Sequence, residues 1–151
     1  MGLDIEHRTS TRHARTFERN GYRVVQRGGR YDVFARVFAV QLLRRVVRRR
    51  QRSTLTLEIW NGVPWFGPLW APRRRVVWMH HVHRDMWADV LPRPLAAVGR
   101  FVETRFAPLF YRGSVFATLS ESSADEIERI GISRSQLTVI PPGVHERFTP
   151  D

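Results

Sequence analysis

Residues 115–144 constrain the fold of this chain more than any other stretch. The apolar run Val115–Leu119 predicts a buried strand, and a serine-rich turn and a short helix follow it. A second strand is expected at Leu137–Ile140, where Pro141-Pro142-Gly143 ends it because proline cannot donate a ladder hydrogen bond. A strand, a helix and a strand in this order form a βαβ unit, the building block of a parallel sheet with helices on its faces.

The same alternation extends toward the N-terminus. Further strands are expected at Leu3–His7, Tyr22–Gln26, Leu55–Trp60 and Val76–His80, with helices at Phe34 to about Arg50 and at Pro94–Tyr111, the second kinked at Pro108. Ser122 or Ser123 is expected to cap the last helix, which Gly131 closes. The sequence therefore predicts the α/β class: a partial Rossmann-like parallel sheet with helices on both faces. Residues 1–151 are interpreted as one incomplete domain, with an inter-domain linker starting in 141–151.

Composition excludes several classes of protein. The chain has no cysteine, so it can form neither a disulfide framework nor a thiolate metal site. It has no run of about 18 apolar residues that would span a bilayer. Its start, MGLDIEHRTSTRHARTF, lacks the layout of a secretory signal. We therefore expect a cytoplasmic protein, or one that is peripheral at the inner face of the membrane.

The net charge of +11 comes from arginine, because the chain contains no lysine. A GC-rich genome explains this bias, yet arginines attract polyanions such as anionic lipid, nucleic acid or phosphorylated small molecules. The basic amphipathic segment Ala35–Arg52 is interpreted either as a solvated face or as a membrane-docking helix. The aromatic residues lie in apolar runs and not on a basic strand face, which disfavours nucleic acid as the partner.

Histidines gather after the strand expected at Val76–His80, in the segment His80-His81-Val82-His83-Arg84-Asp85-Met86-Trp87. On an extended backbone His81, His83 and Asp85 would share one face. This pattern begins like the zinc-binding signature of metallo-β-lactamases, but Met86 interrupts it. Two other interpretations stay open: loop histidines satisfied by backbone and water, or a pocket that binds sugar hydroxyls or phosphate and shuttles protons.

Asn61 and Gly62 form a turn signal after the strand expected at Leu55–Trp60. The aromatic residues around this turn are either ordinary core or a stacking wall for a sugar or a lipid; they are Trp60, Trp65, Phe66 and Trp70. Glu58 lies inside the expected strand, where a buried carboxylate needs partners.

Ser120, Glu121 and Ser122 follow the strand Val115–Leu119. Helix capping accounts for a serine here, while a carboxylate at the carboxyl end of a parallel strand can also bind a sugar hydroxyl. The chain has no GxSxG motif, which argues against a serine hydrolase.

Six segments, in order over roughly residues 20–150, together resemble the N-terminal domain of family 4 glycosyltransferases, which are retaining enzymes with the two-domain GT-B architecture. The segments are RVVQRGGRYDVF, LEIWNGVPWFGPLW, HHVHRDMW, LAAVGRFVETRFAPLFYR, TLSESSADEIERIGI and VIPPGVHERFTP. The resemblance implies that the chain supplies the acceptor side of a cleft, and that a nucleotide sugar and a sugar or lipid-linked acceptor meet in it.

The resemblance also implies roles for particular residues. The implied catalytic residues are His81, His83 and Glu121, and the implied substrate-binding residues are Asn61, Gly62, His80, Arg84, Trp87, Ser120 and Ser122. No metal site and no cofactor bound by this chain are expected. The nucleotide-sugar donor would bind a C-terminal domain that is missing here.

The chain departs from the family pattern at three places. It has no counterpart of the family's opening strand and Gly-rich loop, it has no Glu-x7-Glu element, and His145 stands where the family has aspartate after Pro-Pro-Gly-Val. We therefore expect no sugar transfer by this chain alone. The alternatives are a basic module that binds nucleic acid or an anionic surface, a non-functional gene fragment and, last, a metal-dependent hydrolase.

Overall fold

The computed structural model describes residues 6–9, 13–29, 32–47, 55–71 and 74–143, with the side chains of residues 6 and 7 left out. The chain divides into two compact units, Met1–Arg52 and Ser53–Asp151, and each is described by itself. The single domain and the linker starting in 141–151 stay predictions; residues 144–151, with His145, lie outside the described residues.

The first unit contains a small mixed sheet. Its strands are β1 (Glu6–Thr9), β2 (Arg15–Arg19) and β3 (Tyr22–Gln26), in the order β1-β3-β2, with β1 parallel and β2 antiparallel to β3. The prediction of β3 is confirmed, whereas β2 was not predicted. The signal for it was present, because Asn20 and Gly21 both have positive φ in the hairpin turn, as an Asn-Gly pair favours.

Helix α1 (Val33–Val47) follows this sheet. The prediction of a helix from Phe34 to about Arg50 is confirmed as far as Val47, and residues 48–50 lie outside the described residues. Val33 and Val37 are buried, whereas Val46 and Val47 near its C-terminus are 66% and 70% exposed. The helix therefore buries only its first turns.

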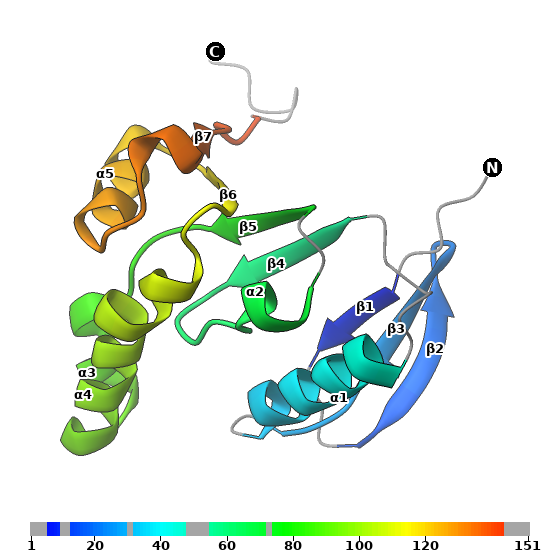
Figure 1. Ribbon diagram of the computed structural model, residues 1–151. Coiled ribbons are helices and arrows are strands. Elements are labelled where there is room, and N and C mark those ends of the chain that lie inside the picture. The colour runs from blue at the N-terminus through cyan, green and yellow to red at the C-terminus, as the bar shows by residue number, and fades with distance from the viewer. Residues whose placement is uncertain (1–5, 10–12, 30–31, 48–54, 72–73, 144–151) are drawn as a thin grey trace, which may run out of the picture. The chain divides into compact units, whose positions relative to one another are not determined.

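The second unit is built on an all-parallel sheet. Its strands are β4 (Thr56–Trp60), β5 (Arg75–Met79), β6 (Val115–Thr118) and β7 (Leu137–Val139), hydrogen-bonded in the order β4-β5-β6-β7 (Figure 1). Helices connect and flank these strands. The predicted Rossmann-like α/β class is confirmed, and each of the four predicted strands agrees with the structure to within one residue at each end.

The helical elements of the second unit are mostly short. They are α2 (Gly67–Trp70), the 3-10 turn η1 (Arg84–Met86), α3 (Trp87–Val90), α4 (Arg93–Phe101), the π-helical η2 (Val102–Phe106), the 3-10 turn η3 (Ala107–Phe110), α5 (Glu121–Arg129) and the 3-10 turn η4 (Arg134–Gln136). Within the described residues, no helix is long and apolar enough to cross a membrane.

The predicted helical segment over Pro94–Tyr111 is confirmed as far as Phe110, but its second half is not a regular α-helix. Pro94 does lie in the first turn of α4, as expected. The backbone then widens into the π-helical η2 before it tightens into η3, which contains Pro108. We attribute the change to Pro108, because its ring would clash with the carbonyl of Thr104 in a regular α-helix.

The N-cap of helix α5 lies two or three residues earlier than predicted. Ser120, and not Ser122 or Ser123, is the N-cap: its Oγ accepts the backbone N–H of Ser123 at 3.2 Å. Ser120 has an extended backbone, with φ −149° and ψ 160°, so the helix starts at Glu121. Gly131 closes it with φ +100°, as predicted.

The core of this unit lies between the sheet and the helical segments. Trp60, Tyr111 and Phe116 are fully buried, and the rings of Trp60 and Tyr111 have their centroids 4.7 Å apart. The residues packed around them include Val77, Met79, Ile127 and Ile132. Trp60 therefore belongs to the core and not to a stacking wall for a sugar.

Candidate functional site

The carboxyl ends of the parallel strands bring the predicted site segments to one edge of the sheet. Trp60, the last residue of β4, is paired with Met79, the last residue of β5, and β6 ends beside them. Asn61 and Gly62 therefore leave the sheet next to residues 80–83. Ligands of open parallel sheets bind at this edge.

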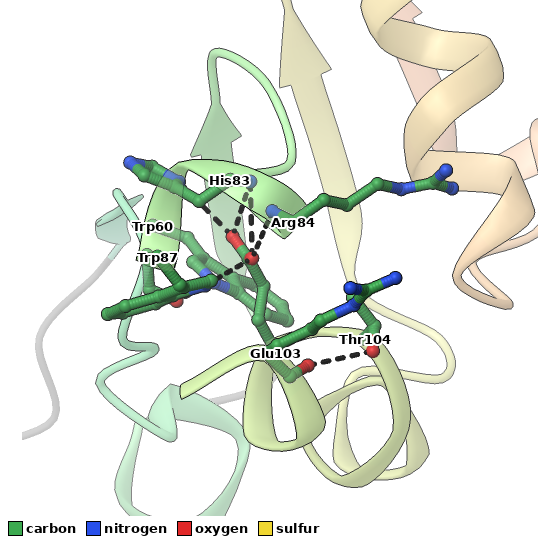
Figure 2. Close-up of polar contacts among 8 residues, drawn as sticks. Trp60, His83, Arg84, Trp87, Glu103 and Thr104 are labelled. Carbon is green, nitrogen blue, oxygen red and sulfur yellow. Dashed lines mark hydrogen bonds and ion pairs between the residues drawn. The ribbon is translucent and has the colours of Figure 1, made fainter. Parts of the chain in front are cut away.

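A buried carboxylate, Glu103 of η2, holds the segment that follows β5 (Figure 2). Its side chain is fully buried. Its oxygens accept the backbone N–H of His83 at 3.0 and 3.1 Å and that of Arg84 at 3.2 Å. They also lie 2.9 Å from Nε1 of Trp87 and 3.2 Å from Nδ1 of His83. One carboxylate thus binds three residues of this segment.

Trp87 connects this network to the loop after β4. A Cβ atom on Gly62, which has φ +79°, would lie 3.1 Å from the Trp87 ring, and one on Gly99 of α4 would lie 2.8 Å from it. The indole therefore packs between two glycines. Trp60 fixes the first of them, since its Nε1 donates to the Gly62 carbonyl at 2.9 Å.

His81 and His83 lie together beside this indole. Their ring centroids are 4.7 Å apart, and the His83 and Trp87 rings are 5.8 Å apart. The His83 side chain is 18% exposed. Nε2 of His81 is buried and has no hydrogen-bond partner in the described part of the chain, which is unusual for a buried polar atom.

Asp85 does not share a face with the two histidines, so that prediction is wrong. The strand ends at Met79, and the chain turns into η1 at Arg84, whose φ is +35°. Asp85 is instead exposed and accepts a hydrogen bond from Arg100 at 3.0 Å. Among the residues that the structure describes, no group of three or more His, Cys, Asp or Glu could hold a metal ion.

The other predicted site residues lie at the same edge without joining this cluster. Ser120 caps α5, and Ser122 Oγ lies 3.0 Å from Ser120 Oγ. Glu121 is exposed and forms an ion pair with Arg134. The remaining predicted residues differ in exposure: His80 and Asn61 are exposed, and Arg84 is half-buried with its N–H on Glu103.

A second buried carboxylate, Glu58 of β4, closes the loop that contains α2. Its Oε1 accepts the backbone N–H of Trp65 at 2.9 Å and a hydrogen bond from the hydroxyl of Tyr111. Burial raises the pKa of the Glu58 carboxyl from its ordinary 4.5, and burial and this neighbour raise the pKa of Tyr111. The expectation that Glu58 needs partners is confirmed, and its contacts are structural.

Sequence reasoning missed Glu103. The signal was the row Ala96, Gly99, Glu103 and Ala107, at spacings of three and four residues on one helix face. Small residues on that face leave room for a large partner, which is Trp87.

The sequence matches the model of one protein family over residues 1–143, and that family is described as a glycosyl transferase 4-like domain. The chain belongs to this family. No curated protein and no solved structure matches it significantly. In this glycosyl transferase 4-like domain, the matched region contains every predicted site residue, so the resemblance seen in the six sequence segments is confirmed at the level of the family.

Proposed function

We propose that this glycosyl transferase 4-like domain is the acceptor-side half of a retaining GT-B enzyme, which moves a sugar from a nucleotide-sugar donor to a sugar or lipid-linked acceptor. One observation carries the proposal: Gly62, His81, His83 and Trp87 lie together at the carboxyl edge of a parallel sheet. Family membership supports the reaction class.

The cluster suits the recognition of a sugar. Imidazole nitrogens bind hydroxyls, and the buried Trp87 indole, packed between two glycines, supports the segment that carries the two histidines. In retaining transfer of this kind the leaving phosphate takes the acceptor proton, so the protein supplies positioning and electrostatics. His81 and His83 would supply them from this chain. Glu121 would contribute if it exchanged its Arg134 partner for a sugar hydroxyl.

The donor would be held elsewhere. Because the sequence contains no Glu-x7-Glu element, we expect the nucleotide sugar to bind a partner domain. Residues 1–151 should therefore bind acceptor sugars weakly and transfer nothing when mixed with a nucleotide sugar. We place the enzyme in the cytoplasm, in contact with the inner membrane face through its basic surface.

The test is an NMR titration of the 15N-labelled chain with a panel of methyl glycosides. We expect signals of Gly62, His83 and the Trp87 indole to shift with at least one glycoside. His83→Ala should weaken that response, whereas His13→Ala is the matched control, because His13 is exposed and lies in the first unit, which contains none of the predicted site residues.

Two results would contradict the proposal. The first is the absence of a response at these residues with every glycoside tested. The second is a response to RNA or DNA that depends on base sequence and is lost steeply with salt, which would favour a nucleic-acid module.

A further inference from the structure

We propose that Glu103 is a positioning residue that fixes the tautomer of His83, so that His83 presents Nε2 as a hydrogen-bond acceptor to a hydroxyl group of the bound sugar. The identity of the ligand rests on the proposed function. The tautomer rests only on the contacts around Glu103, and the two parts can be tested separately.

The donors around Glu103 determine where the His83 proton lies. The backbone N–H groups of His83 and Arg84 and the indole N–H of Trp87 can only donate, and all three reach the Glu103 oxygens at 2.9–3.2 Å. A carboxyl group surrounded by three donors acts as an acceptor. Nδ1 of His83, 3.2 Å from Oε1, is therefore the protonated nitrogen. In the neutral ring Nε2 then carries the lone pair.

The same contacts hold the imidazole in place. Glu103 binds both the backbone N–H and the ring nitrogen of His83, which leaves the ring little freedom about its side-chain torsions (Figure 2). The carboxylate itself is fully buried and is held by Trp87. The exposed 18% of the His83 side chain is the part a ligand can reach, and a carboxylate that orients an imidazole in this way is a recurrent device of functional sites.

In its neutral form the His83 ring selects the chemistry of the ligand. Its Nε2 then accepts a hydrogen from a hydroxyl group, whereas it cannot bind a phosphate oxygen, which is itself an acceptor. The backbone at Arg84, with φ +35°, is also stabilised by its hydrogen bond to Glu103. The strained turn that directly follows His83 therefore depends on the same carboxylate.

The tautomer can be read from long-range 1H–15N correlations of the full chain labelled at histidine nitrogens, at a pH where the imidazoles are neutral. We expect His83 to be protonated at Nδ1, and His80, which is exposed, to show the mixture of a free imidazole. This measurement needs no variant. A His83 protonated mainly at Nε2 would overturn the proposal.

Glu103→Gln tests the cause, with Glu128→Gln on the exposed face of α5 as the matched control. We expect His83 to lose its single tautomer in E103Q only, and the affinity for a responding methyl glycoside to fall about tenfold, the contribution of one good hydrogen bond. A folded E103Q chain with an unchanged His83 tautomer would overturn the positioning role. An Nδ1–H tautomer without any glycoside response would support that role and overturn the ligand, together with the proposed function.

Discussion

Two buried carboxylates, Glu58 and Glu103, hold the loops at the carboxyl edge of the second unit. Glu58 accepts hydrogen bonds from the backbone N–H of Trp65 and the hydroxyl of Tyr111. Glu103 accepts hydrogen bonds from the backbone N–H groups of His83 and Arg84 and from side-chain donors of His83 and Trp87. Burial of a carboxylate is costly unless such partners are present. The two residues differ in what they hold in place: Glu58 contacts the core residue Tyr111, whereas Glu103 contacts the histidine cluster.

The raised pKa of Glu58 makes stability depend on pH. The unfolded chain releases this proton near the ordinary 4.5, while the folded chain keeps it to a higher pH. In that window the folded state binds more protons, so the free energy of unfolding falls as pH rises. Glu58→Gln does not titrate, and its carbonyl oxygen can still accept from Trp65 and Tyr111.

We therefore expect the wild-type chain to lose stability relative to E58Q as pH rises above about 4.5, measured by urea unfolding across a pH series. Glu128→Gln is the control, since Glu128 is exposed. Parallel stability curves for the wild type and E58Q would show that the folded-state pKa of Glu58 is not raised.

Gly99 is expected to reverse the usual effect of helix propensity. Glycine to alanine inside a helix ordinarily stabilises by about 0.5–1 kcal/mol, but a Cβ atom here would lie 2.8 Å from the Trp87 ring. Gly99→Ala should instead destabilise by about 1–3 kcal/mol, as overpacking does, and should shift the Trp87 fluorescence. Ala97→Gly, at an exposed position of the same helix, measures propensity alone. Stabilisation by G99A equal to the loss in A97G would contradict the packing argument.

The segment from α4 to η3 buries the face that carries its alanines and Glu103, and not the face that carries its large apolar side chains. Ala96, Glu103 and Ala107 are buried, whereas the apolar positions that predicted a helix are largely exposed; they include Leu95, Val98, Phe101, Phe106 and Leu109. Apolar periodicity thus predicted the existence of the helix and misled about its orientation. The large Trp87 ring requires small neighbours, and this requirement fixes the orientation.

The cap of α5 offers a direct test of one corrected element. Ser120→Ala should cost about 0.5–2 kcal/mol of stability because it removes the acceptor of the Ser123 N–H. Ser122→Ala, at an exposed position two residues later, should stay within about 0.5 kcal/mol. Thermal or urea unfolding of both variants measures these two losses of stability. Equal losses would contradict the assignment of Ser120 as the N-cap.

Local patterns therefore predicted the parallel strands and the edge at which the histidines lie. They did not predict which side chains meet there. Glu121, next to a strand end, pairs with Arg134, which is 13 residues away, and the partner of His83 is Glu103, which is 20 residues away. Neither pairing has a periodic signal, because both depend on how helices cross the sheet and not on spacing along the chain.

The net charge of the whole molecule leads us to expect attraction to polyanions. With +11 net charge, the chain should bind anionic surfaces in a salt-dependent manner whatever its function. A specific membrane contact needs apolar side chains as well. Helix α1 offers them, because Leu43, Val46 and Val47 are exposed beside Arg44 and Arg45.

We expect the chain to sediment with vesicles that contain phosphatidylglycerol and not with phosphatidylcholine vesicles. The double change Val46→Ser and Val47→Ser preserves charge and helix propensity, and should weaken vesicle binding roughly tenfold. Val98→Ser, on the exposed side of α4, is the matched control. If neither the double variant nor Val98→Ser changed vesicle binding, the binding would be due to charge attraction alone. An effect of Val98→Ser without an effect of the double variant would contradict docking through α1.

The hydrogen bonds of Glu103 also have a consequence for how residues 83–87 and η2 open to solvent. The amide hydrogens of His83 and Arg84 are bonded to it and not to a neighbouring strand, so they can exchange with solvent only when the carboxylate withdraws. We therefore expect residues 83–87 and the helical segment that carries Glu103 to open together, so that the loop beside the histidines exchanges its amide hydrogens as slowly as that segment does.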